Sequence, residues 1–183
     1  MRSVLISIQP KWCELISSGK KTVEVRKTKP KLKTPFKVYI YCTKDFKPNV
    51  KYGFKLWAGR GKVIGEFICD YIFEIKAEHE IHTELPGNPV ETWYSWEDAP
   101  EEYLEDADIE KATCLSFGDI KYYMWNSGGC FCWNISDLVI YDQPKDLGEF
   151  TKPYGTIVRA FDSPYIQRPP QSWRYVEELE DGK

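Results

Sequence analysis

The chain has 183 residues, which is long enough for one domain with a sizeable core. Hydrophobic residues make up 42% of it, and seven Trp, twelve Tyr and nine Phe exclude a disordered chain. The net charge of −3 excludes the overall basic signature of many nucleic-acid-binding proteins, so any phosphate contact depends on a local patch. We expect a single domain over residues 1–183.

Two predicted elements open the chain. Residues 4–8 are apolar and rich in β-branched side chains, a pattern that predicts a strand. Pro10 suits the first position of a following helix, and Gly19 suits a left-handed cap at its end. The apolar face expected for this helix consists of Trp12, Leu15 and Ile16.

A polar row follows the glycine. Residues 19–26 read Gly-Lys-Lys-Thr-Val-Glu-Val-Arg and predict a strand whose side chains alternate between two faces. One face holds Val23 and Val25, and the other holds Thr22, Glu24 and Arg26. With Lys20 and Lys21 at the entrance of the cleft that it would face, the polar row suits a ligand such as a nucleotide. We expect Lys21, Glu24 and Arg26 to line one concave, partly exposed pocket.

Alternating patterns predict further strands at 36–42, 62–75, 130–141 and 172–178, with Gly65 marking a bulge. We expect the strand before Pro10 and the strand after Gly19 to belong to the same sheet or barrel.

Loops and two more helices complete the predicted elements. Glycine and proline mark loops at 43–61 and 80–98 and a turn-rich stretch at 144–156. An acidic helix is expected within 100–111. A second helix is expected over 116–125, with Ser116 as its N-cap. The apolar face of that helix consists of Phe117, Ile120 and Met124. Strands mixed with a few helices indicate an α+β, barrel-like fold.

Charge is unevenly distributed along the chain. Residues 20–37 are basic, with Glu24 as their single acid, and residues 97–110 are strongly acidic. The cations of the basic stretch are Lys20, Lys21, Arg26, Lys27, Lys29, Lys31, Lys33 and Lys37. This stretch is either a phosphate-binding patch or a solvated loop. The acidic stretch leaves open a third interpretation, a protein–protein adaptor.

The six cysteines are scattered within apolar stretches, as reduced core cysteines are. A zinc site would need Cys130 and Cys132 to meet His79 and His82, and paired Cys-x-x-Cys spacing is missing. We therefore expect no metal and no other cofactor. The first apolar run is too short for a signal peptide, and no stretch is long enough to cross a membrane. A cytoplasmic location is expected.

The residue pattern resembles the ASCH domain, a member of the PUA-like superfamily. Matching segments are Ser7-Ile8-Gln9-Pro10, the Gly-Lys-Lys-Thr-Val-Glu-Val-Arg row, Gly65-Glu66-Phe67 and Arg168-Pro169-Pro170-Gln171-Ser172-Trp173. The last segment is similar to ASCH proteins of phages and prophages. The resemblance implies a PUA-like mixed β-barrel with flanking short helices and a cleft beside the first helix and second strand.

The resemblance also bears on chemistry. Some ASCH enzymes deacetylate cytidine acetylated on its exocyclic amine, using a threonine three residues after the motif lysine. Here that position is Glu24, which argues against a threonine nucleophile. Their third catalytic member is a downstream glutamate, for which Glu110 is a positional guess. Other members have been proposed to cleave RNA.

The leading hypothesis is binding of RNA or a nucleotide-like ligand in a cleft lined by lysine, glutamate and arginine. The candidate ligand-binding residues are Lys20, Lys21, Thr22, Glu24, Arg26, Ser172 and Trp173. The alternative is an amidohydrolase or ribonuclease acting on a modified nucleoside or RNA, with Lys21 and Glu24 as its catalytic residues. A structural interpretation also stays open, with Lys21 at a helix end and Glu24–Arg26 as an exposed ion pair.

Overall fold

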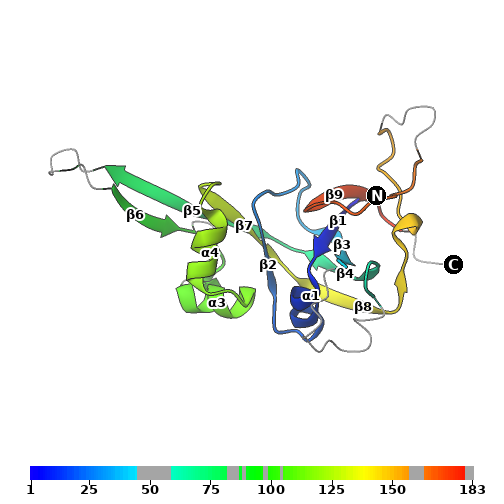
Figure 1. Ribbon diagram of the computed structural model, residues 1–183, viewed down its shortest axis with the longest axis horizontal. Coiled ribbons are helices and arrows are strands. Elements are labelled where there is room, and N and C mark those ends of the chain that lie inside the picture. Colours follow the sequence, from blue (N-terminus) through cyan, green and yellow to red (C-terminus); the bar gives the residue numbers. More distant parts are fainter. Residues whose placement is uncertain are drawn as a thin grey trace. The chain divides into compact units, whose positions relative to one another are not determined.

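The computed structural model describes residues 1–44, 59–81, 87, 90–96, 99–103, 105–156 and 163–179. Their strands form two sheets of five and four strands (Figure 1). The chain divides into two compact units. Unit 1 comprises residues 1–20, 32–70 and 135–183, and unit 2 comprises residues 21–31 and 71–134. The expected α+β class is confirmed, whereas the described residues form two sheets and no closed barrel.

Unit 1 contains the five-stranded sheet, in the order β8-β4-β3-β1-β9. Its strands are β1 (Arg2–Ile8), β3 (Phe36–Cys42), β4 (Val63–Cys69), β8 (Ser136–Lys145) and β9 (Trp173–Glu177). β1 pairs in parallel with β3, and the other neighbours are antiparallel. A short 3-10 helix, η2 (Leu147–Glu149), follows β8. The core of this unit includes Leu5, Tyr39 and Phe150.

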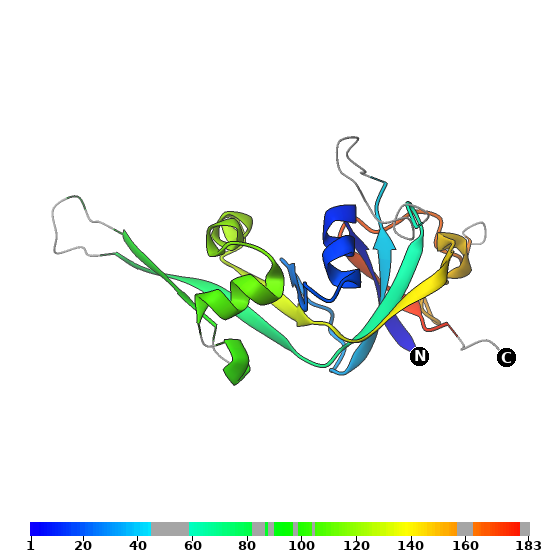
Figure 2. The same ribbon diagram turned by 90° about the horizontal axis from the view of Figure 1, so that it is seen from below.

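Helix α1 (Pro10–Ser17) follows β1 (Figure 2). It ends just before Gly19, as the sequence predicts. Gly19 has a φ of 72° and donates its N–H to the carbonyl of Ile16, while the N–H of Lys20 reaches Leu15. These two bonds form a Schellman motif, which needs a left-handed residue. The buried face differs from the expected one. It holds Pro10, Cys13 and Ile16, whereas Trp12 and Leu15 are only half-buried, because the small Cys13 side chain packs like an apolar residue.

Unit 2 contains the four-stranded antiparallel sheet, in the order β2-β7-β5-β6. Its strands are β2 (Val23–Arg26), β5 (Ile72–Ile81), β6 (Val90–Ser95) and β7 (Gly129–Asn134). The helical elements are η1 (Glu101–Tyr103), α3 (Asp106–Thr113) and α4 (Phe117–Met124). One core joins sheet residues such as Val23 and Phe73 to Ile109 of α3 and Ile120 of α4.

Helix α4 confirms the prediction from local signals. Its face of Phe117, Ile120 and Met124 is buried. Ser116 is the N-cap, and its side chain accepts from the N–H of Asp119 at 3.1 Å. Asp119 reciprocates by accepting from the N–H of Ser116 at 3.3 Å. This capping box satisfies two donors at the helix start.

Three strand predictions need correction. The single strand expected at 62–75 is β4 and β5, and the one expected at 130–141 is β7 and β8. In both cases the chain changes sheets within one or two residues, at Asp70–Tyr71 and at Ile135, so the apolar pattern continues across the break. The prediction that the strand before Pro10 and the strand after Gly19 share one sheet is also wrong. β1 lies in the five-stranded sheet and β2 in the four-stranded sheet.

Two further segments test the loop and bulge predictions. The loop expected over 80–98 includes β6, which pairs with the far end of β5 as a hairpin arm. Its first four residues are exposed, so it carries no apolar alternation. The bulge at Gly65 is confirmed, because the pairing of β4 with β8 shifts register beside it. The expected loop at 43–61 lies mostly outside the described residues.

Candidate functional site

The polar row is held at the edge of the sheet of unit 2. β2 pairs with β7 so that Glu24 lies opposite Trp133 and Arg26 opposite Phe131. Just before the strand, the N–H of Thr22 donates to the carbonyl of Ala112 at 2.9 Å, which ties the segment to the end of α3. The valines enter the core, as the alternation predicts. The strand therefore presents Glu24 and Arg26 on its other face.

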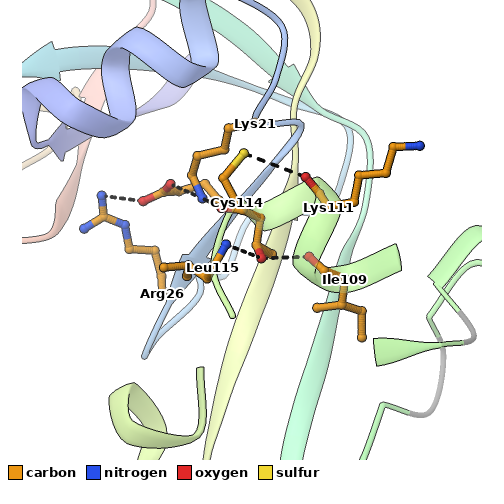
Figure 3. A network of polar contacts seen from close by, with 8 residues as sticks. Lys21, Arg26, Ile109, Lys111, Cys114 and Leu115 are labelled. Carbon is orange, nitrogen blue, oxygen red and sulfur yellow. Dashed lines mark hydrogen bonds and ion pairs between the residues drawn. The ribbon is translucent and has the colours of Figure 1, made fainter. Parts of the chain in front are cut away.

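Glu24 joins two cations (Figure 3). Its Oε2 lies 3.3 Å from Nζ of Lys21, and its Oε1 lies 2.9 Å from Nη2 of Arg26. Lys21 also donates from Nζ to the carbonyl of Thr113 at 2.7 Å. We call Lys21, Glu24 and Arg26 the charged cluster. It contains two positive groups and one negative group, so it carries an excess of one positive charge.

The charged cluster is more deeply buried than expected. The side chains of Lys21 and Glu24 are only 2% and 7% exposed, and that of Arg26 is 12% exposed. Of the three side chains expected to line a partly exposed pocket, only that of Arg26 is half-buried, whereas those of Lys21 and Glu24 are buried. Burial removes water from the charges, so their mutual contacts and the Thr113 carbonyl replace their hydration.

The end of α3 supplies that carbonyl. The hydroxyl of Thr113 donates to the carbonyl of Ile109 at 2.7 Å and accepts from the N–H of Leu115 at 3.3 Å. Cys114 then takes a left-handed φ of 55°, and its Sγ donates to the carbonyl of Lys111 at 3.7 Å (Figure 3). Lys21 thus neutralises the negative end of a helix. That helix is α3, and not the helix that precedes Lys21 in sequence.

Neighbouring titratable groups respond to the charged cluster. A hydrogen bond from the Cys132 thiol to Cys130 and burial raise the pKa of Cys132, with Lys21 opposing and Glu24 adding to the shift. Burial also raises the pKa of Tyr123, which Arg26 lowers and Glu24 raises. Both groups therefore stay protonated near neutral pH.

Other predicted site residues lie elsewhere. Thr22 precedes the strand and is exposed, and its side chain forms a hydrogen bond with that of Tyr103. Lys20, Ser172 and Trp173 belong to unit 1. There Lys20 is exposed, Ser172 accepts from the N–H of Ser7 at 2.9 Å, and Trp173 packs edge-on against Tyr175 at 5.4 Å. Their participation in one site with the charged cluster stays a prediction.

The remaining candidates have structural contacts. The carboxylate of Glu110 accepts from the N–H of Phe117 at the start of α4. Cys130 and Cys132 lie in the core, and His79 contacts Thr92 on the β5–β6 hairpin at 2.9 Å. His82 lies outside the described residues. Within the described part of the chain, no group of three or more His, Cys, Asp or Glu side chains is arranged to hold a metal ion.

Sequence reasoning missed two features around the charged cluster. One is the Thr113 carbonyl, a main-chain group that no side-chain pattern signals. The other is a set of lysines that lie over aromatic rings, Lys27 over Tyr123 and Lys29 over Phe131. Among the helices of the described residues, none is long and apolar enough to span a membrane.

Comparison with known proteins supports the fold. The crystal structure of the ASCH protein from Zymomonas mobilis matches with a TM-score of 0.51 and 20% identity, covering 96% of this chain and 88% of that one. A serine-to-alanine variant of that protein matches with a TM-score of 0.52 and 19% identity, covering 96% and 89%. No curated protein sequence gives a match. The family model of the ASCH domain matches residues 6–121, which include the whole charged cluster. The chain therefore belongs to the ASCH domain family.

Proposed function

We propose that this protein binds RNA or a nucleotide-like ligand through the charged cluster. The observation that carries the proposal is the excess positive charge of the largely buried charged cluster of Lys21, Glu24 and Arg26. Buried ion pairs are a poor means of stabilising a fold, since apolar residues of the same volume do as well or better. A binding role explains why three charges occupy this position.

The three side chains suit different parts of a nucleotide. Arg26 is the most exposed member, and a planar guanidinium suits bidentate contact with phosphate. Glu24 is an acceptor for an exocyclic amine, and Lys21 holds its carboxylate in place. Family membership supports a nucleic-acid ligand, because RNA binding is frequent in the PUA-like superfamily. A cytoplasmic location, a phage or prophage origin and the single-domain organisation stay predictions.

Binding is tested by titrating labelled RNA and a panel of nucleotides against wild type, Arg26→Ala and Arg2→Ala. Arg2 is a charge-matched control in unit 1. We expect Arg26→Ala to weaken binding and to make the slope of log affinity against log salt shallower by about 0.7 for a single strand. Arg2→Ala should leave both unchanged. Equal affinity of Arg26→Ala and wild type would reject the role of the cluster.

The enzymatic alternative uses the same residues, with Glu24 as a general base toward an amide or an RNA phosphodiester. We expect no acyl-enzyme route on acetylated cytidine, because the family's nucleophilic threonine is replaced by Glu24. Glu24 acting as a general base on water would release cytidine more slowly. If only Glu24→Thr forms cytidine, the fold is competent for deacetylation and the wild-type chain is a binding protein. Robust release by wild type that survives Glu24→Ala would instead show an enzyme that works without this carboxylate.

A further inference from the structure

The C-terminal end of α3 contacts the two residues that lead into β2. The last carbonyls of a helix lack donors within their own helix, so they accept from groups outside it. The carbonyl of Ala112 accepts from the N–H of Thr22 at 2.9 Å, and the next carbonyl, that of Thr113, accepts from Nζ of Lys21 at 2.7 Å. All four residues belong to unit 2. Two successive residues before β2 are therefore bonded to one turn of α3.

Two local features set the direction of the carbonyl that Lys21 contacts. Thr113 is fully buried, and its hydroxyl donates to the carbonyl of Ile109 and accepts from the N–H of Leu115 (Figure 3). These bonds join the last turn of α3 to the residue beyond Cys114. Cys114 itself has a φ of 55° and a ψ of 30°, a left-handed conformation that residues other than glycine, asparagine and aspartate rarely adopt. The hydroxyl and this turn together fix the Thr113 peptide group.

The series of contacts continues from Lys21 to Arg26. Nζ of Lys21 contacts one carboxylate oxygen of Glu24, and the other oxygen contacts the guanidinium of Arg26. Lys21 and Glu24 are both buried and offset each other's charge, so the excess positive charge is carried by Arg26, the most exposed member. Because the Lys21 side chain is only 2% exposed, little water is available to replace a lost contact. A shift of the Thr113 carbonyl therefore moves Lys21, and with it the carboxylate that orients Arg26.

We propose that Thr113 is a positioning residue, which places Lys21 and thereby Glu24 and Arg26 for ligand binding. The inference rests on the proposed function and deepens it, because it assigns Arg26 to the ligand and Lys21 to the support of Glu24. A threonine hydroxyl that donates to the carbonyl four residues earlier does not by itself stabilise a helix. Helix stability alone therefore does not account for a buried threonine at this position, whereas placement of the Lys21 ammonium does.

The test uses the full chain and two readouts. The first is NMR of the lysine ammonium groups, in which a scalar coupling across the hydrogen bond joins Nζ of Lys21 to the carbonyl carbon of Thr113. The second is the affinity for labelled RNA and for the common ribonucleoside monophosphates. Thr113→Val keeps the branched shape and removes the hydroxyl, whereas Thr113→Ser keeps the hydroxyl. Ser116→Ala is the control, because it removes the cap of α4 in the same unit.

Thr113→Val should abolish the coupling and weaken binding by about 2- to 10-fold, the range of one net hydrogen bond. Thr113→Ser should retain both the coupling and the affinity. Ser116→Ala should lower stability and leave the coupling and the affinity unchanged.

A second pair of variants separates the backbone conformation of Cys114 from its thiol. Cys114→Gly and Cys114→Val both remove the thiol, but only glycine adopts the left-handed conformation without strain. Cys114→Gly should keep the coupling and the affinity of wild type. Cys114→Val should weaken both, because the turn that directs the Thr113 carbonyl is then disfavoured.

Several outcomes would overturn the inference. Thr113→Val could keep the coupling, or lose it and still bind as tightly as wild type, and the proposed function would stand in both cases. Equal weakening by Ser116→Ala and Thr113→Val would trace both effects to lost stability. Loss of affinity in Cys114→Gly would assign the effect to the thiol. If wild type binds neither RNA nor these nucleotides, the proposed function fails, and the coupling in Thr113→Val alone decides whether Thr113 places Lys21.

Discussion

Glu24 is the only negative side chain of the charged cluster, so it alone offsets the charges of Lys21 and Arg26. Glu24→Ala leaves the ammonium of Lys21 buried, with the Thr113 carbonyl but without its carboxylate. We expect the free energy of unfolding to fall by about 3–5 kcal/mol, as when one partner of a buried pair is removed. Urea unfolding of the purified variant measures the loss. The double variant Lys21→Met/Glu24→Ala should recover much of it. A loss in Glu24→Ala below about 1 kcal/mol, the range of exposed pairs, would contradict this prediction.

Tyr39 makes the stability of unit 1 sensitive to alkali. Its ring is fully buried against Phe150, and its hydroxyl accepts from the N–H of Leu179 at 2.9 Å. Burial raises the pKa of Tyr39 from 10.0 to about 12, although the Leu179 bond lowers it. The folded state therefore holds this proton more tightly than the unfolded chain does. The resulting stability is present in full below pH 10 and is lost as the pH rises toward 12.

The measurement compares urea unfolding of wild type and Tyr39→Phe across this window. Tyr39→Phe should lose less stability between these pH values, by at most about 2–3 kcal/mol. Tyr41, Tyr71, Tyr103 and Tyr123 also have raised pKa values, so only the difference between the two proteins reports on Tyr39. Parallel pH dependences in both proteins would contradict the assignment.

Side-chain patterns identified the charged cluster but not its surroundings. Alternation on β2 placed Glu24 and Arg26 on one face because a strand has a fixed two-residue period. The contact between Lys21 and the Thr113 carbonyl joins positions 92 residues apart through a main-chain group. No residue type is required for such an acceptor, so the sequence gives no signal for it. Burial of Lys21 and Glu24 was missed for the same reason.

At the scale of elements, local signals were the reliable ones. Helix α4 was predicted from its cap and its apolar period, both of which act within one or two turns. The change of sheet between β4 and β5, and between β7 and β8, was not predicted. Each change occupies one or two residues, and alternation of apolar side chains reports burial without reporting which sheet provides it.

The capping box of α4 gives a prediction about that element. Ser116→Ala removes the acceptor for the Asp119 N–H and one partner of the Asp119 carboxylate. We expect a loss of about 1 kcal/mol in the free energy of unfolding. Thermal or urea unfolding measures it. Ser17→Ala, at the end of α1, is the control, because that exposed hydroxyl contacts only the Glu14 carbonyl of its own helix among the contacts described. Equal losses in the two variants would show that the cap contributes nothing specific.

Gly65 allows a close approach of two strands. A Cβ at this position would lie 2.3 Å from the carbonyl oxygen of Val139, a main-chain atom of β8. Gly65→Ala must therefore push β4 and β8 apart, and we expect a loss of roughly 1–3 kcal/mol in stability. Hydrogen exchange should show weaker protection in both strands. At Gly148 an added Cβ meets no atom within 4 Å, so Gly148→Ala should be nearly neutral. Wild-type stability of Gly65→Ala would contradict the close approach.

At the scale of the whole molecule, the path of the chain links the two units. The chain passes from one unit to the other after residues 20, 31, 70 and 134. Unit 1 is assembled from three separate segments and unit 2 from two. Two of the passages join consecutive strands directly, β4 to β5 and β7 to β8. A domain boundary usually falls where few connections cross, in an exposed linker. The direct connections from β4 to β5 and from β7 to β8 contain no such linker, so they differ from a usual domain boundary.

We therefore expect the two units to unfold together, as one domain does. Loss of β5 from its sheet frees the end of β4, and loss of β7 frees the start of β8. When one unit unfolds, the ends of the segments that connect the strands of the other unit are therefore no longer held together. Fluorescence and circular dichroism should give coincident urea transitions. As a sharper measurement, Glu24→Ala in unit 2 should lower the exchange free energy of β3 amides in unit 1 by the same amount as that of β7 amides. Gly65→Ala should act in the reverse direction. If Glu24→Ala weakens protection in β7 and leaves β3 unchanged, the units are separate domains and the single-domain prediction is wrong.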